Sequence, residues 1–140
     1  MRYPPMMVQP MREELTRIGF EELMTPDEVD RVMQDTHGTL LVVVNSICGC
    51  AAGAARPGVA LALEKGPQPD RLTTVFAGME IEATDRARAH FAPYPPSSPQ
   101  IGLFKEGKLV HMMERSDIEG RPASEIAANL AEAFAEHCGA

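Results

Sequence analysis

The chain has 140 residues, 44% of them hydrophobic, and a net charge of −7 with no basic block. This composition suits one compact domain with a real core, and its acidity argues against a nucleic-acid or anionic-membrane partner. No apolar run approaches the roughly 20 residues of a membrane span, and the N-terminus lacks the apolar stretch of a secretory signal. Three cysteines form no disulfide framework, so a cytosolic, reducing location is expected.

Two helices are predicted before the first strand. Apolar residues at helical spacing over residues 6–19 indicate an amphipathic helix. Thr25 followed by Pro26 and Glu28 has the pattern of a capping box with proline in the first turn. A second helix is therefore expected over Pro26–Asp35.

A βαβ unit is predicted next. Thr39–Asn45 is apolar at nearly every position, as expected for a central, parallel strand that is covered on both faces. A helix should follow over residues 50–65, with a kink at Pro57. After a loop, branched residues at 72–76 indicate a second strand, and a helix is expected over residues 81–91.

The C-terminal part predicts a hairpin and a final helix. A rigid loop comes first, marked by Pro93, Pro95, Pro96 and Pro99. Strands are expected at residues 101–104 and 109–113, joined by a short glycine-containing turn. Residues 117–120 are expected to form a loop, and Pro122 opens a last helix with one apolar stripe.

The predicted order of elements is α-α-β-α-β-α-β-β-α, which is the order of the thioredoxin fold with an N-terminal helical extension. The expected class is therefore α/β, with a central mixed β-sheet flanked by helices. We expect a single domain over residues 1–140, since no internal repeat or low-complexity segment is visible.

The segment Cys48-Gly49-Cys50 carries the chemistry. It lies between a buried strand and the start of a helix, where backbone N–H groups and the helix dipole favour thiolate over thiol. The thiolate is the nucleophile, so this position indicates reactive sulfur. We assign attack on a disulfide to Cys48, at the mouth of the helix, and resolution of the mixed disulfide to Cys50. One intervening residue closes a small ring, so the Cys48–Cys50 disulfide is expected to be more oxidising than a relaxed one.

Several stretches resemble the bacilliredoxin family. They are the active-site segment at 43–57, the second strand at 74–78, the proline loop at 94–99, and residues 108–112 and 117–121. The resemblance implies a thioredoxin-like disulfide oxidoreductase that removes low-molecular-weight thiol caps, especially bacillithiol, from protein cysteines. It implies no bound cofactor, because the thiol itself is the co-substrate, and it implies S-thiolated or disulfide-containing cytosolic proteins as partners.

The thioredoxin fold also predicts part of the substrate site. In that fold a cis-proline faces the cysteines, and the residue before it offers its backbone to the substrate. Pro99 is expected to be that proline and Ser98 the residue before it. Together with Gly49 they form the expected substrate-binding set. Thioredoxin itself has a Trp where Ile47 stands and an acidic residue in its first strand, so proton handling has no candidate residue in this chain.

Two other functions fit the same cysteines. A disulfide isomerase would use the dithiol on scrambled proteins. A metal-binding or iron–sulfur protein would need further ligands, and Cys138 and the four His have no recognisable ligand spacing, so no metal site is predicted. Cys138, at the end of the last helix, is expected to be a half-buried structural thiol distant from Cys48. Arg56 could supply positive potential near the thiolates, but an arginine here is more often a solvated helix residue, and that is the expectation.

Overall fold

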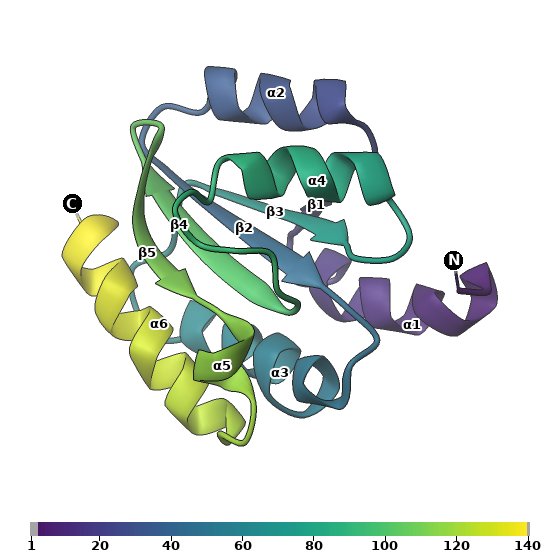
Figure 1. The fold of residues 1–140 in the computed structure, drawn as a ribbon. Helices are drawn as coiled ribbons and strands as arrows, with labels where there is room; N and C mark the ends of the chain where they lie inside the picture. Colours follow the sequence, from purple (N-terminus) through teal and green to yellow (C-terminus); the bar gives the residue numbers. More distant parts are fainter. Residues whose placement is uncertain (1–2, 140) are drawn as a thin grey trace.

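A five-stranded mixed sheet forms the centre of the molecule (Figure 1). The computed structural model describes residues 3–139. The strands, in their order across the sheet, are β1 (Glu21–Glu22), β3 (Arg71–Phe76), β2 (Thr39–Asn45), β4 (Gln100–Lys105) and β5 (Lys108–Met113). β1, β3 and β2 are parallel to one another, whereas β4 is antiparallel to both β2 and β5. The predicted α/β class with a central mixed sheet is confirmed.

Strand β2 is the central strand, and all of its residues are buried, as its unbroken apolar sequence predicts. It is parallel to β3 on one side, where Val43 lies opposite Thr74. On its other side it is antiparallel to β4, where Val43 lies opposite Ile101. The expectation of a parallel strand therefore holds for one of its two neighbours.

Helices cover both faces of this sheet (Figure 1). The longer ones are α1 (Pro5–Thr16), α2 (Pro26–Asp35), α3 (Arg56–Leu63), α4 (Ile81–Ala89) and α6 (Ala123–His137). Leu41 and Val43 of β2 pack with residues of α3 and α6 in one apolar cluster, while Val42 and Val44 pack with residues of α2 and α4 in another. This alternation follows from the period of two along a strand.

The helix after the cysteines differs from the predicted continuous helix over residues 50–65. Its first part, η1 (Ala51–Ala55), is a π-helix, and regular α3 begins only at Arg56 and ends at Leu63. Pro57 lacks the N–H that a regular α-helix would use there, which accounts for a break beside it. Gly58 then allows close contact with α6, because a Cβ at that position would lie 2.6 Å from Cβ of Ile126.

Two short elements were not predicted. Residues 117–120 were expected to form a loop, but one helical turn, α5 (Arg115–Ile118), occupies part of this segment. The side chains of Glu114 and Asp117 form a capping box at its start. These two residues are visible in the sequence, but no apolar run follows them, so the pattern alone does not indicate a helix. Strand β1 is only two residues long and adds to the edge of β3.

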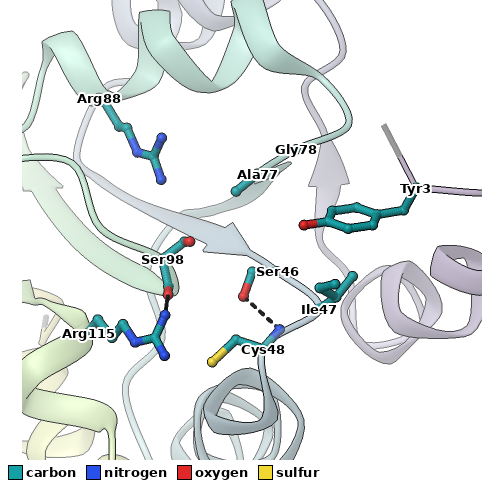
Figure 2. Close-up of a pocket in the computed structure, with 9 residues that line it drawn as sticks. All are labelled: Tyr3, Ser46, Ile47, Cys48, Ala77, Gly78, Arg88, Ser98 and Arg115. Atoms are coloured by element: carbon teal, nitrogen blue, oxygen red, sulfur yellow. Dashed lines mark hydrogen bonds between the residues drawn. The ribbon is translucent and has the colours of Figure 1, made fainter. Parts of the chain in front are cut away.

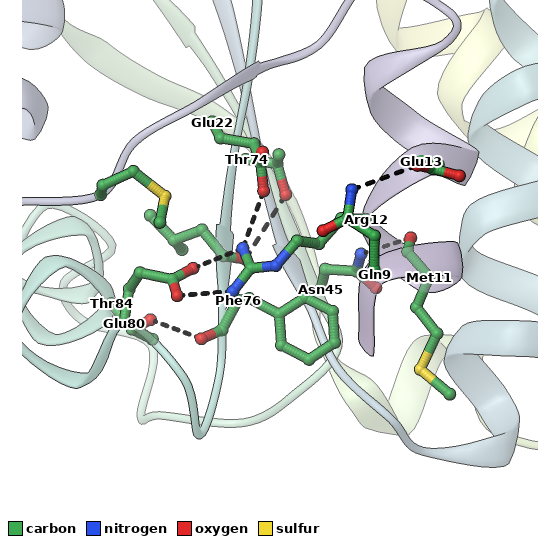
Figure 3. A network of polar contacts seen from close by, with 12 residues as sticks. Gln9, Met11, Arg12, Glu13, Glu22, Asn45, Thr74, Phe76, Glu80 and Thr84 are labelled. Atoms are coloured by element: carbon green, nitrogen blue, oxygen red, sulfur yellow. Dashed lines mark hydrogen bonds and ion pairs between the residues drawn. The ribbon is translucent and has the colours of Figure 1, made fainter. Parts of the chain in front are cut away.

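The N-terminal helix is fastened to the sheet by Arg12 (Figure 3). Its guanidinium donates to Glu22 of β1 at 2.7 Å and to both carboxylate oxygens of Glu80 at 2.8 and 2.6 Å. It also lies over the ring of Phe76, with 5.2 Å to the ring centre. Asn45, the last residue of β2, donates its side-chain amide to the carbonyl of Met11 at 3.1 Å. Helix α1 is thus tied to the end of the sheet from which the cysteine segment leaves.

Candidate active site

The segment Cys48-Gly49-Cys50 follows the end of β2, and the chain becomes helical at Gly49. Cys48 and Cys50 pair as a disulfide with 5.4 Å between their Cα atoms, within the usual range. The backbone N–H of Cys50 donates to Sγ of Cys48 at 3.3 Å. A hydrogen bond of this kind favours negative charge on the sulfur, and the start of a helix acts in the same direction.

The two cysteines have different surroundings. Both are half-buried, but Cys50 packs against the apolar cluster between the sheet and helices α3 and α6. Cys48 instead lines two surface pockets, of which Cys50 lines only one. Cys48 is thus open to both pockets and Cys50 to one of them, and the assignment of attack to Cys48 and resolution to Cys50 stays a prediction.

The first pocket has a volume of about 310 Å³ and contains Cys48 (Figure 2). Its lining residues come from segments far apart in the chain: Tyr3, Ser46, Ile47, Cys48, Ala77, Gly78, Arg88, Ser98 and Arg115. The ring of Tyr3 lies against Gly78, where a Cβ would meet it at 2.8 Å. Gly78 has φ of +85°, a conformation that favours glycine. Its lack of a side chain also leaves room for the ring of Tyr3.

The structure confirms the predicted cis bond at Pro99 and places Ser98 in the pocket of Cys48, while their role in substrate binding stays a prediction. Pro99 is buried. The carbonyl oxygen of Ser98 accepts a long hydrogen bond from Nη1 of Arg115 at 3.5 Å (Figure 2). A second cis bond, Ala92–Pro93, was not predicted.

Gly49 lies in the second pocket, a groove of about 480 Å³ that also contains both cysteines. It is exposed, and a Cβ at this position would meet nothing within 4 Å. Arg115 and Arg121 line the same groove. Gly49 is thus at an open rim where another chain can approach, and its role in substrate binding stays a prediction.

The expectation for Arg56 is wrong: its side chain is 2% exposed, not solvated. Its Nη1 donates to Oδ1 of Asn45 at 2.9 Å and to the carbonyl oxygen of Ser46 at 2.8 Å. Its Nε lies 3.1 Å from a carboxylate oxygen of Glu14, an ion pair without the alignment of a hydrogen bond. Oδ1 of Asn45 also accepts from the N–H of Ser46, whose Oγ accepts from the N–H of Cys48 at 3.2 Å. A buried cation therefore holds the backbone that leads into the cysteines.

Cys138 lies at the opposite end of the sheet. Its thiol is half-buried and lies beside Thr39, the first residue of β2, whereas Cys48 follows the last residue of that strand. Burial raises the pKa of Cys138, while a hydrogen bond with Thr39 acts in the opposite direction. The prediction that this thiol is structural and distant from Cys48 agrees with its position.

Arg88, Arg115 and Tyr3 line the cysteine pocket but were not identified from the sequence. They belong to α4, α5 and the segment before α1, and no local pattern marks them. Among residues 3–139, no group of three or more His, Cys, Asp or Glu is arranged to hold a metal ion. No helix in the same range is long and apolar enough to span a membrane.

A reactive dithiol at the end of a central parallel strand, with a cis-proline nearby, is typical of thiol–disulfide oxidoreductases with the thioredoxin fold. Solved thioredoxins are similar in structure. Thioredoxin from Fasciola hepatica has a TM-score of 0.56 at 20% identity and covers 84% of this chain and 99% of its own. Mitochondrial thioredoxin 3 from Saccharomyces cerevisiae has a TM-score of 0.54 at 15% identity, covering 85% and 96%.

Sequence comparisons give the family. Residues 3–138 match the protein family described as disulphide isomerase. A bacilliredoxin from Koribacter versatilis is 59% identical, covering 99% of this chain and 95% of its own. A bacilliredoxin from Halalkalibacterium halodurans is 52% identical, covering 97% and 94%. The chain belongs to the bacilliredoxin family, as the resemblance in its sequence indicated, and it is a thiol–disulfide oxidoreductase of the thioredoxin type.

Proposed function

We propose that this protein removes low-molecular-weight thiol caps, with bacillithiol as the first candidate, from cysteines of cytosolic proteins. The observation that carries the proposal is the contrast between the two sulfurs. Sγ of Cys48 accepts an N–H and lines both pockets, while Cys50 lies against the core. Such an arrangement suits an accessible nucleophile with a protected second thiol behind it.

The reaction consists of two exchanges. The thiolate of Cys48 attacks the sulfur of the cap, a Cys48–cap disulfide forms, and the protein thiolate leaves with the electron pair of the broken S–S bond. The thiolate of Cys50 then attacks Sγ of Cys48 and releases the cap as a thiolate. The resulting Cys48–Cys50 disulfide returns to the dithiol when an external thiol or a reductase supplies two electrons.

Disulfide isomerase activity is the second candidate, and the family description favours it. An isomerase would also attack through Cys48, but its product would be a rearranged disulfide in the substrate protein. Gly49 at an open rim leaves room for a larger substrate. The two activities differ in the substrate, not in the first step.

A direct test uses a single-cysteine protein capped with bacillithiol and, separately, a scrambled multi-disulfide protein. We expect the wild type to free the capped cysteine much faster than it restores activity to the scrambled protein. Cys48→Ser should abolish both reactions. Faster rescue of the scrambled protein than of the capped one would favour the isomerase, and full cap removal by Cys48→Ser would refute the proposed chemistry.

A further inference from the structure

Arg88 is a half-buried cation without an ion-pair partner among residues 3–139. The other described arginines that are buried or half-buried, Arg12, Arg56 and Arg71, each pair with a carboxylate. Arg88 instead donates to two neutral acceptors, through Nη2 to the carbonyl oxygen of Ser97 at 2.8 Å and through Nε to Oε1 of Gln100 at 3.3 Å. No carboxylate of the described residues therefore lies within ion-pair distance of its guanidinium.

The position of Arg88 is fixed. Gln100 is fully buried, and its amide nitrogen donates to the carbonyl oxygen of Pro95 at 3.1 Å. That bond orients the opposite end of the amide, Oε1, toward Arg88. A guanidinium has five N–H donors, so the two bonds to Ser97 and Gln100 leave others available. Figure 2 shows the guanidinium of Arg88 directed into the pocket that contains Cys48.

Arg115 lines the same pocket, and in Figure 2 Ser98 lies between it and Arg88. Arg115 pairs with Glu119 at 2.9 Å at the surface, so part of its charge is already compensated. Two arginines thus line the pocket of Cys48 in a chain with a net charge of −7. Local positive potential of this kind attracts an anionic ligand and also favours the thiolate.

Burial lowers the pKa of Arg88, and Asp85 on the same helix acts in the opposite direction. The shift reflects the loss of hydration around a charge that lacks a close counter-ion. A carboxylate brought in by a ligand would supply that counter-ion. The planar fork of a guanidinium fits a carboxylate through paired hydrogen bonds.

We propose that Arg88 binds a carboxylate on the low-molecular-weight thiol that forms the mixed disulfide with Cys48. Arg115 contributes a second, weaker attraction. The inference rests on the proposed function and names a recognition element of its substrate: the thiol cap carries a negative charge. The volume of about 310 Å³ suits a small ligand rather than a protein segment. The carboxylate does not react, and the sulfur exchange is unchanged.

The test compares two caps on the same single-cysteine protein. One cap is glutathione, and the other is a glutathione analogue in which both carboxylates are carboxamides. With enzyme in excess, the rate constants of cap removal give a ratio of charged to neutral cap. We expect Arg88→Gln to lower this ratio by about 10-fold or more, the usual effect of losing a hydrogen bond to a charged group. Arg88→Lys should give an intermediate ratio, because it keeps the charge but not the fork.

Arg86→Gln is the matched control. Arg86 lies on the same helix, is exposed, pairs with Asp30 and lines neither cysteine pocket, yet its loss changes the net charge equally. Its ratio should equal that of the wild type. Any loss of folded protein cancels in the ratio, since both rates come from one preparation.

Three results would overturn the inference. An unchanged ratio in Arg88→Gln, with both rates equally reduced, would make Arg88 a support of the proline loop and leave the proposed function intact. An effect that appears only when acidic residues flank the capped cysteine would show that Arg88 recognises the protein partner instead. Failure of the wild type on both glutathione caps, and also on the same protein capped with bacillithiol, would remove the proposed function and this inference with it.

Discussion

Cys48 and Cys50 differ in their environment although a single residue separates them. After the strand-to-helix turn, Cys48 lines both pockets, whereas Cys50 lines only the second one and packs against the core. Behind the turn, Arg56 joins the end of β2 to Ser46 through buried hydrogen bonds. Strand β2 contains no acidic residue. The buried charge near the site is instead the guanidinium of Arg56.

At this scale the first prediction concerns Arg56. Arg56→Met should lower the free energy of unfolding by about 2 to 4 kcal/mol, because buried acceptors on Asn45 and Ser46 would lose their charged donor. Arg31→Met, at an exposed position of α2, should change it by less than about 0.5 kcal/mol. Urea denaturation of the oxidised proteins measures both. Equal effects of the two substitutions would contradict the structural role of Arg56.

A second prediction at the residue scale concerns Cys138. Burial raises the pKa of this thiol in the folded protein, the largest influence on it, with Thr39 acting in the opposite direction. The thiol therefore contributes stability in full below the unfolded thiol pKa of about 8.5, and that contribution is lost as the pH rises through the folded pKa. Relative to Cys138→Ala, the oxidised wild type should lose stability from about pH 8.5 upward. Parallel pH profiles of unfolding for the two proteins would show that no such shift exists.

At the scale of elements, Arg12 is the main polar attachment of helix α1, whose apolar residues Val8 and Leu15 are also buried. Arg12 joins it to Glu22 of β1 and to Glu80, which immediately precedes α4 (Figure 3). Residues 77 and 78, shortly before Glu80, line the cysteine pocket, and Tyr3 lies against Gly78. The segment before α1 therefore lines the candidate active site through Tyr3.

Arg12→Met should lower the free energy of unfolding by about 2 to 4 kcal/mol, because Glu80 would stay nearly buried without its partner. Arg17→Met is the control on the same helix, since Arg17 forms an exposed pair with Glu13. Its effect should stay below about 0.5 kcal/mol. If denaturant unfolding gave the same loss for both, the attachment of α1 would have to lie elsewhere.

The elements with strong patterns were predictable, and the weakly patterned ones were not. Thr39–Asn45 and Pro26–Asp35 have the predicted bounds, since one is uniformly apolar and the other begins with Thr25 and a proline. Even there, Thr25 accepts from the N–H of Glu28 as predicted, but the Glu28 carboxylate accepts from Met24 rather than Thr25. Strand β1 and helix α5 are too short to show a period; β1 is defined by its pairing with β3, and α5 has only its capping box as a local signal.

The residues of the site also fall into those that the sequence predicts and those that it does not. Cys48, Ser98 and Pro99 carry local signals, a strand-to-helix junction and a proline loop, and the cis bond confirms part of that prediction. Arg88 has none, because an arginine on an amphipathic helix usually faces solvent. Its position in the pocket depends on how α4 packs on the sheet, which the sequence pattern does not specify.

At the scale of the whole molecule, the chain is acidic, yet the two pockets of Cys48 are lined by arginines. Arg88, Arg115 and Arg121 line the two pockets of Cys48. Cys138 lies beyond the other end of β2, beside Thr39. The redox chemistry of the molecule should therefore depend on the Cys48–Cys50 pair alone.

The disulfide of this pair should be a stronger oxidant than that of thioredoxin, at about −270 mV. A ring closed across one residue has little freedom to relax, and the helix start stabilises the reduced thiolate. Cys138→Ala should leave the potential unchanged. Equilibration with dithiothreitol or glutathione buffers measures it. A potential at or below that of thioredoxin would contradict the ring argument, and a large effect of Cys138→Ala would contradict the separation of the two thiol sites.

The central claim is that Cys48 takes up the cap and Cys50 releases it. Intact-mass spectrometry with peptide mapping tests this on Cys50→Ser after incubation with a bacillithiol-capped protein. We predict one bacillithiol adduct per chain, located on Cys48, because the step that removes it is missing. Cys48→Ser should carry no adduct. An adduct on Cys50 in Cys48→Ser, together with none in Cys50→Ser, would contradict the account and reverse the roles of the two cysteines.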